Sequence, residues 1–148
     1  MDRVNHILMI VCVLILFSDV SYAEKNNIKL TVNVSGAIAD KGQLIFSLFN
    51  SEDDFLKKPI IEIIEKVDSN GGGYFVVSLI YKGVYAVSIA YDEDNNGMLN
   101  TGFMGIPTEL VGVSNNAKGF FGPPSFEDAS FEINESQTIH IKLGAAEE

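Results

Sequence analysis

Cysteine, tryptophan and histidine are nearly absent from this sequence of 148 residues, which has one Cys, no Trp and two His. A single cysteine cannot form an intrachain disulfide, and Cys12 lies in an apolar N-terminal segment that we expect to be removed. Because His140 is the only histidine beyond that segment, a Cys/His zinc site is excluded, as is a cysteine nucleophile. The absence of Trp excludes an antibody-type core. Stability must therefore come from packing and from any bound ion.

Basic residues are also scarce. Lys and Arg together number 10 against 20 Asp and Glu, which gives a net charge of −10. A surface of this sign repels nucleic acid and anionic headgroups, and it is compatible with binding cations. We therefore expect no nucleic-acid partner.

The N-terminal segment has the layout of a signal peptide. Arg3 precedes the continuous apolar run Ile7–Phe17, which is too short to cross ~30 Å of hydrocarbon as a helix. Ser21–Ala23 places small residues at the −3 and −1 positions of a cleavage site. We expect residues 1–23 to be removed and residues 24–148 to form a single periplasmic or secreted domain without a transmembrane segment. The alternatives are an uncleaved membrane anchor and a lipoprotein modified at the cysteine.

Strand patterns dominate the remainder of the chain. Ile28–Val34 alternates apolar and polar residues, as a half-buried strand does, and Gln43–Asn50 is apolar enough for a central strand covered on both faces. Ile60–Val67 also fits a helical period, but its isoleucines favour a strand. Three glycines at 71–73 mark a tight reversal. The other predicted strands are Tyr74–Ile80, Val84–Tyr91, Leu110–Val113, Ser130–Ile133 and Thr138–Leu143.

Short strands at close spacing, without a long helical pattern, predict an all-β fold. We expect an antiparallel β-sandwich of about seven strands with a transthyretin-like or immunoglobulin-like Greek-key topology. A weak capping box at Ser125–Asp128 predicts one helical turn. The residues expected to face inward between the sheets are Leu30, Val32, Val34, Leu44, Phe46, Leu48, Phe75, Val77, Leu79, Tyr85, Val87 and Ile89.

The stretch YDEDNNGMLN, Tyr91–Asn100, has the ligand spacing of a calcium loop. Calcium takes about six to eight oxygen ligands, and a short loop supplies them from alternate residues with a glycine, here Gly97, at the bend. Phe103 occupies the position of the bidentate Glu of an EF-hand, and a strand enters the loop, so Glu109 is the candidate for a more distant carboxylate. The predicted calcium ligands are the side chains of Asp92, Asp94, Asn96, Asn100 and Glu109 and the carbonyl of Met98.

The alternative interpretation of this loop is a solvated hairpin turn without a metal, since Asp, Asn and Gly are ordinary turn residues. Asp92, Glu93 and Asp94 are consecutive, however, and their like charges repel one another at this spacing. A cation would relieve that repulsion. The ligands would be numerous, mixed and flexible, which favours Ca²⁺ in a structural role over Mg²⁺.

A second unusual segment, NNAKGFFGPPSFEDASF, carries aromatic residues outside the predicted strands. Phe120, Phe121 and Phe126 lie in this segment, and Phe103 is nearby. Together they form either an exposed patch for a partner or hydrophobic ligand, or a buried plug over one end of the sandwich. We take the four phenylalanines as the candidate binding residues.

Several motifs in the C-terminal half resemble those of a known family. They are GVYAV, DEDNNGMLN, GIPTE, SNNA and FGPPSFEDA, which begin at Gly83, Asp92, Gly105, Ser114 and Phe121. The pattern is similar to the bacterial family called domain of unknown function 2141, except that Asn100 stands where Asp is more usual. The resemblance implies a secreted or periplasmic protein with no assigned activity. A more distant similarity to transthyretin-type and calcium-binding B-repeat sandwiches concerns the fold alone.

The sequence shows no catalytic constellation. His140 falls on the polar side of a predicted strand, and no nucleophile motif is present. The acids at positions 92, 94, 109, 127 and 128 are abundant enough for a glycosidase, but abundance does not establish a catalytic pair. We expect a non-enzymatic exported module that binds or adheres to a protein or envelope partner. The alternatives are a structural envelope component without a small ligand and a carboxylate-based hydrolase.

Overall fold

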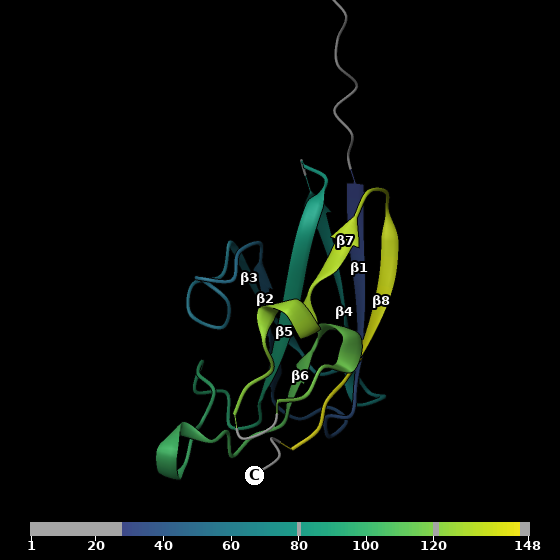
Figure 1. Ribbon diagram of the computed structural model, residues 1–148. Coiled ribbons are helices and arrows are strands. Elements are labelled where there is room, and N and C mark those ends of the chain that lie inside the picture. The colour runs from purple at the N-terminus through teal and green to yellow at the C-terminus, as the bar shows by residue number, and fades with distance from the viewer. Residues whose placement is uncertain (1–27, 80, 120–121, 146–148) are drawn as a thin grey trace, which may run out of the picture.

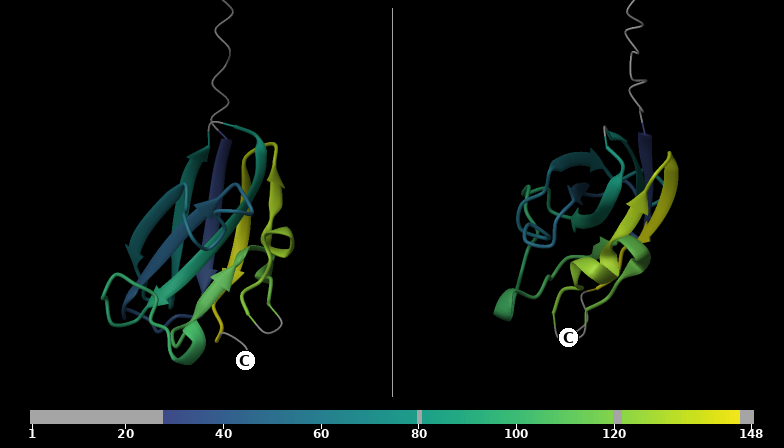
Figure 2. Two further views of the ribbon diagram at one scale, coloured as in Figure 1. Left: turned by 60° about the vertical axis from the view of Figure 1, so that its left-hand side comes forward. Right: turned by 45° about the horizontal axis from the view of Figure 1, so that its top comes forward.

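The computed structural model describes residues 28–79, 81–119 and 122–145, which form two β-sheets packed face to face (Figures 1 and 2). The three-stranded sheet has the order β4 (Gly72–Leu79), β1 (Ile28–Ser35) and β8 (Gln137–Lys142). The five-stranded sheet has the order β3 (Ile61–Lys66), β2 (Gln43–Phe49), β5 (Gly83–Asp92) and β6 (Val111–Val113), and β7 (Phe131–Ile133) also pairs with β5. The predicted all-β sandwich is confirmed.

One strand pair departs from the predicted antiparallel arrangement. β1 and β8 run parallel, from Leu30 opposite Gln137 to Ser35 opposite Lys142, whereas the other described pairs are antiparallel. Parallel neighbours require a long connection, and here nearly the whole domain separates the first strand from the last. The alternation of apolar and polar residues is the same in both orientations, so the pattern could not distinguish them.

Local sequence patterns correctly predicted two of the shorter elements. The isoleucine-rich segment forms strand β3 and not a helix. The predicted helical turn is α1 (Phe126–Ala129), in which the Ser125 hydroxyl accepts a hydrogen bond from the Asp128 N–H at 3.1 Å. No helix in the described part of the chain is long and apolar enough to cross a membrane.

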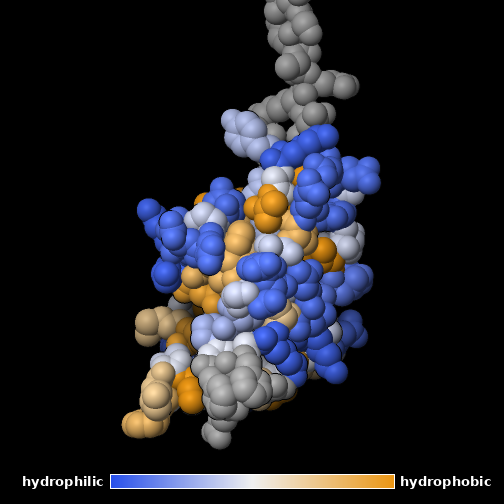
Figure 3. Space-filling model, in the orientation of Figure 1, coloured by the Kyte–Doolittle hydropathy of each residue, from blue (hydrophilic) through white to orange (hydrophobic). Residues whose placement is uncertain are grey.

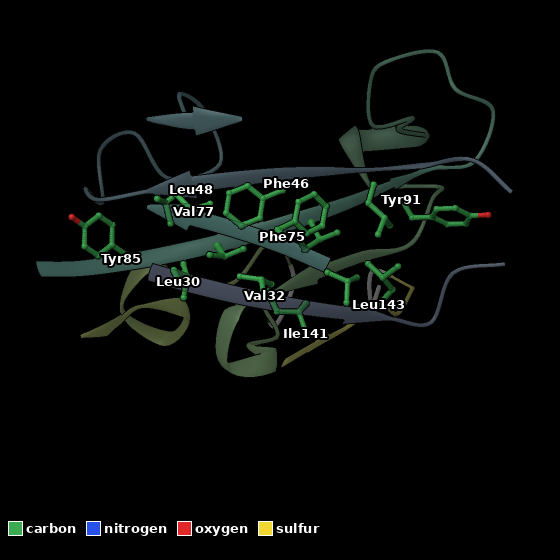
Figure 4. Packing of buried hydrophobic residues seen from close by; sticks show 14 of the residues in the cluster. Leu30, Val32, Phe46, Leu48, Phe75, Val77, Tyr85, Tyr91, Ile141 and Leu143 are labelled. Atoms are coloured by element: carbon green, nitrogen blue, oxygen red, sulfur yellow. The ribbon is translucent and has the colours of Figure 1, made fainter. Parts of the chain in front are cut away.

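The main core lies between the two sheets, where the stacked rings of Phe46 and Phe75 occupy its centre with centroids 5.1 Å apart (Figure 4). Tyr85 and Tyr91 lie at opposite ends with their hydroxyls directed outward. The residues predicted to face inward are buried, which confirms that prediction, except that the Leu79 side chain lies outside the described residues. The core gains further members that were not predicted: Ile28, Val67, Tyr91, Ile133, Ile141 and Leu143.

A second, smaller apolar cluster was not predicted. It lies on the face of β5 that points away from the main core. Its buried residues come from β2, the segment after it, β5, β6 and α1, and they are Phe49, Phe55, Ala86, Val113 and Ala129. Phe55 lies edge-on to both Phe49 and Phe126, at centroid distances of 5.3 and 5.6 Å. Both faces of the central strands are therefore covered, as the apolar composition of β2 indicated.

The turn η2 (Ser114–Asn116) connects this cluster to both sheets through its polar side chains. β7 pairs with residues 83–85 of β5 and β6 with residues 88–90, and the buried Ser114 hydroxyl accepts the Val87 N–H between them at 2.9 Å. The same hydroxyl donates to the Ala129 carbonyl at 2.5 Å. The Asn115 amide donates to the carbonyls of Asp128 and Ser130, and the Asn116 amide oxygen accepts the Lys142 N–H.

Replacing Phe46 with Ala should lower the free energy of unfolding by about 3–5 kcal/mol, because it leaves a cavity in a fully buried site beside Phe75. Chemical denaturation monitored by circular dichroism measures this change. The matched control is Phe103→Ala, since the Phe103 side chain is 87% exposed and its truncation should change stability by less than about 0.5 kcal/mol. Equal effects of the two substitutions would show that the burial assignment is wrong.

Replacing Ser114 with Ala should also destabilise the fold, by about 1–3 kcal/mol, because the Val87 N–H and the Ala129 carbonyl lose their buried partner. Ser69→Ala, at an exposed turn position, is the control and should leave the unfolding midpoint nearly unchanged. Hydrogen exchange gives a local readout, since the Val87 amide should lose protection. An unchanged exchange rate at Val87 would contradict the proposed bond.

Candidate metal centre

The acidic loop begins at Asp92, the last residue of β5, at the end of the sandwich opposite the start of β1 (Figure 1). The chain turns sharply there. Asn95 has φ of 58° and Gly97 has φ of 82°, a left-handed conformation that Asn and Gly adopt more readily than other residues. The opening stretch DEDNNG is therefore a compact turn at the strand end, as its composition predicted.

A hairpin follows the loop and returns the chain to it. Thr101 and Pro107 form an isolated β-bridge, and the Thr108 N–H donates to the Asn100 carbonyl at 2.9 Å. The turn η1 (Phe103–Gly105) forms the tip of the hairpin. Because the two arms are paired, Glu109 comes back beside the acidic loop.

Asp92 is a fully buried carboxylate. Its Oδ2 accepts hydrogen bonds from the Gln43 side-chain amide at 2.6 Å and from the Gly97 N–H at 2.8 Å, and its Oδ1 accepts the Asn96 N–H at 3.0 Å. Burial alone would raise the pKa of Asp92, but the hydrogen bonds from Gln43, Gly97 and Asn96 outweigh it and hold the pKa below its ordinary value. The Asp92 carboxyl group is therefore favoured as an anion at neutral pH.

Three of the predicted ligands converge. Asp92, Asp94 and Glu109 each place one carboxylate oxygen so that all three oxygens lie within 4.8 Å of one another. Oxygens that share one calcium ion at about 2.3–2.6 Å can be at most about 5 Å apart, so the cluster fits the coordination shell of one ion. Asp92 is buried, Glu109 is half-buried and Asp94 is exposed.

Glu109 also connects the two arms of this region. Its Oε1 accepts the Glu93 N–H at 2.9 Å, and its Oε2 accepts the Asn100 N–H at 2.8 Å. The carboxylate thus links the start of the loop to its end. The choice of Glu109 as the distant carboxylate rested on sequence proximity, and the structure places it beside Asp92 and Asp94.

The predicted amide ligands lie next to Asp94. Its Oδ2 accepts hydrogen bonds from the side-chain amides of Asn96 and Asn100, both at 3.1 Å. The Asn96 amide also donates to the Asn100 side-chain oxygen at 2.8 Å, and the Asn96 side-chain oxygen accepts the Met98 N–H. Both amide oxygens therefore accept hydrogen bonds within the loop. The predicted ligand of Met98 is its backbone carbonyl, and its side chain, which is not a predicted ligand, is 66% exposed.

Two residues beside the cluster were not predicted. Gln43, the first residue of β2, lies directly opposite Asp92 in the strand register and donates to its carboxylate. Lys41 forms an ion pair with Glu93, whose carboxylate is not one of the three that converge. Register is fixed by tertiary pairing, so no local pattern in the sequence could have connected Gln43 to Asp92.

The predicted aromatic residues have different environments. Phe103 is 87% exposed at the hairpin tip, whereas Phe126 is half-buried against Phe55 in the second apolar cluster. Phe120 and Phe121 lie outside the described residues. Of the two predicted phenylalanines that the structure describes, only Phe103 presents its ring to solvent.

The remaining candidates for acid chemistry lie on other elements. Asp128 accepts a hydrogen bond from the Ser125 hydroxyl at 2.5 Å as part of the cap of α1, and Glu127 is exposed on the same turn. His140 is exposed on β8. The structure therefore does not place these residues in the Asp92, Asp94 and Glu109 cluster.

Replacing Asp92 with Asn should lower the free energy of unfolding by about 1–3 kcal/mol in EDTA, because an amide NH₂ would face the donors that the carboxylate now satisfies. Asp94→Asn is the control, since Asp94 is exposed and water can replace its partners.

The stability of the protein should also depend on pH through Asp92. The pKa of Asp92 in the folded protein is below the unfolded value of about 3.9. The ionised Asp92 therefore stabilises the fold above that pH, and this stabilisation is lost as the pH falls through the folded pKa. Asp92→Asn should remove this part of the acid sensitivity, and a mutant as acid-sensitive as the wild type would contradict the assignment.

Comparison with known proteins gives one result. The family model described as "Uncharacterized protein conserved in bacteria (DUF2141)" matches residues 32–141, which include most of both sheets and the whole acidic loop. No curated protein and no solved structure matches the chain. The match covers well over half of the sequence, and the protein belongs to the DUF2141 family.

Proposed function

We propose that this protein is an exported, non-enzymatic binding module whose acidic loop holds a structural calcium ion. The observation that carries the proposal is the convergence of three carboxylate oxygens, from Asp92, Asp94 and Glu109, within 4.8 Å of one another. These side chains come from a strand end, a loop and a returning hairpin arm. An ion at their centre would join three segments of the chain.

The electrostatics of the cluster favour a cation. Like charges a few ångströms apart repel one another, by about 1 kcal/mol per pair at 4 Å in water and by more in a less polar environment. Asp92 is held as an anion inside the fold by its hydrogen bonds, so protonation is an unfavourable way to relieve this repulsion at neutral pH. A divalent ion with hard oxygen ligands relieves it directly. The side-chain amides of Asn96 and Asn100 lie beside Asp94, and their oxygens, with the Met98 carbonyl, would be further ligands of the kind that calcium accepts.

Export is the second part of the proposal and rests on the signal-peptide layout of residues 1–23. Outside the cytoplasm, extracellular calcium modules function with dissociation constants of about 10⁻⁴–10⁻³ M, so a modest site would be filled. N-terminal sequencing of the protein from the envelope or the medium should give a chain that starts at Glu24. Recovery of a chain that starts at Met1 would contradict the proposal of cleavage.

A binding role is favoured over catalysis because the acids of the cluster accept structural hydrogen bonds. The carboxylates of Asp92 and Glu109 both accept backbone N–H groups and so act as structural acceptors. The exposed Phe103 at the adjacent tip favours a partner-binding module over an inert envelope component.

Calcium should raise the melting temperature of the wild-type protein relative to EDTA. An ion that binds only the folded state adds RT ln(1 + [L]/Kd), about 2.7 kcal/mol at a hundredfold excess over Kd. Asp94→Ala should abolish this calcium-dependent rise, and differential scanning calorimetry measures it.

The matched control is Glu93→Ala, because the Glu93 carboxylate pairs with Lys41 and lies outside the cluster. Glu93→Ala should keep most of the calcium response, and Glu109→Ala should lose more of it. Each variant is compared with itself in EDTA, which removes the effect of lost hydrogen bonds in the metal-free protein. Identical melting curves of the wild type in EDTA and in excess calcium would show that the loop is a polar turn.

A further inference from the structure

Strand β4 is an outer strand of the three-stranded sheet, and its composition is unusual for an edge. Residues 69–81 include no Asp, Glu, Lys, Arg or Pro, whereas the edge strand β3 of the other sheet is charged at positions 62, 65 and 66. The register of β4 with β1 is continuous over all eight residues, without a bulge. Charged residues, prolines and bulges are the usual means of keeping an edge strand from pairing with another chain, and β4 has none of them.

The hydrogen bonds of β1 show which residues of β4 face this edge. In a strand, the N–H and C=O of one residue point to one side, and those of the next residue point to the other side. The Ser35 carbonyl accepts the Leu143 N–H, and the Lys29 N–H donates to the Ser136 hydroxyl, so the odd-numbered residues of β1 face β8. The even-numbered residues of β1 therefore face β4, where they lie opposite Gly73, Phe75, Val77 and Leu79.

The backbone groups of Tyr74, Val76 and Ser78 consequently point away from β1. Gly72 agrees with this assignment, because its N–H and its C=O both bond to Asp68 and not to β1. In the part of the chain that the structure describes, no strand pairs with this side of β4. Three exposed residues thus each offer one N–H and one carbonyl at the spacing of a strand, and the Tyr74 and Val76 side chains are exposed by 64% and 44%.

The other outer strand of this sheet, β8, has polar protection. Thr138, His140 and Lys142 are exposed along it, and Figure 3 shows hydrophilic residues over the right of the molecule, where β8 lies in Figure 1. The Lys142 N–H is also bonded to the Asn116 side chain. Of the two outer strands of this sheet, β4 is therefore the one that is suited to accept a further strand.

The charges at the two ends of β4 indicate which strand it accepts. The exposed Lys29 and Lys82 lie at the end of β4, and the exposed Asp68 and Asp40 lie at its start. An antiparallel copy of the same strand places the basic end of one copy beside the acidic end of the other. We propose that two copies of the chain pair through β4 in an antiparallel, two-fold arrangement that joins their three-stranded sheets into one.

The free backbone groups also determine the register. With the two-fold axis at Val76, this residue pairs with its own copy, and Tyr74 pairs with Ser78 of the second copy, so all three residues use their free N–H and C=O groups. An axis at Tyr74 would instead place Val76 opposite Gly72, whose groups are already bonded to Asp68. The axis at Val76 is therefore the one that satisfies the exposed edge.

This arrangement also limits repulsion between two chains of net charge −10. The acidic loop lies at the end of the sandwich where β4 starts (Figure 1). Antiparallel pairing places the two loops at opposite ends of the joined sheet, beyond the range of strong interaction in salt. One strand from each copy should bury less surface than the roughly 1,200 Å² at the lower end of stable interfaces, so we expect a dimer that dissociates on dilution.

Sedimentation equilibrium of the chain from residue 24 onward, which contains every described residue, measures this pairing. The average mass of the wild type should rise toward twice that of the monomer as the concentration increases. Val76→Lys should keep the protein monomeric, because it places two like charges directly opposite each other at the two-fold axis. The matched control Thr138→Lys adds the same charge at an exposed position of β8 and should associate as the wild type does.

Cysteine substitutions test the register independently, because Cys12 is the one native cysteine and precedes residue 24. Opposite residues of a hydrogen-bonded pair have Cα atoms about 5.5 Å apart, which a disulfide can bridge. Val76→Cys should therefore give a disulfide-linked dimer on oxidation with copper phenanthroline. Ser78→Cys is the matched control, since its copy would lie four residues along the strand, about 14 Å away and beyond the reach of a disulfide.

The outcomes separate the occupants of the edge. A wild type that stays monomeric at every concentration up to its solubility limit contradicts the inference and leaves the edge to a strand of another protein. Association that Val76→Lys retains, or cross-linking of Ser78→Cys as fast as that of Val76→Cys, also contradicts it. Association that Val76→Lys loses and Thr138→Lys keeps, with cross-linking confined to Val76→Cys, supports pairing of two β4 strands. Neither measurement involves calcium, so failure here leaves the calcium proposal unaffected.

Discussion

The hydrogen bonds of the buried Asp92 carboxylate are the interactions on which the acidic end of the sandwich depends. This carboxylate receives hydrogen bonds from Gln43 on β2 and from the backbone of Asn96 and Gly97, so it joins two strands to the loop that follows them. Without these donors, burial would favour its neutral form, and the loop would lose both its anchor and its fixed negative charge. The pairing of β2 with β5 thus supplies, through Gln43, one of the hydrogen bonds that keep the pKa of Asp92 below its ordinary value.

Much of the sandwich could be predicted, because each strand has a face toward the core and a face away from it. The alternation in Ile28–Val34 and the fully apolar β2 directly reflect half-buried and fully covered strands. The parallel pairing of β1 with β8 could not be predicted, since period-two alternation does not encode strand direction. The second apolar cluster was hidden for another reason: Phe55 and Phe126 lie outside strands, and loops have no period from which burial can be read.

The candidate site divides in the same way. The spacing of candidate ligands within the loop follows from chain geometry, so Asp92 and Asp94 could be chosen from the sequence. Glu109 could be chosen as a third acid because it follows the loop at a short distance in the sequence. Gln43 could not be chosen, because its position opposite Asp92 depends on β-register. The polar turn at Ser114 shows the same limit: the hydroxyl and the two amides were visible, but their partners on β5, α1 and β8 are distant in sequence.

The link between the acidic loop and the apolar tip is mechanical, and Glu109 provides it. Each of its carboxylate oxygens accepts one backbone N–H, one from Glu93 and one from Asn100, and each retains a further lone pair. The calcium ion proposed above would therefore not need to break either hydrogen bond, and its binding would strengthen an arrangement that already exists. Since Asn100 and Thr108 hold the base of the hairpin together, fixing Glu109 also fixes the direction of the tip. A ligand-free loop would leave the same contacts with repelling charges beside them, and the tip would be less firmly held.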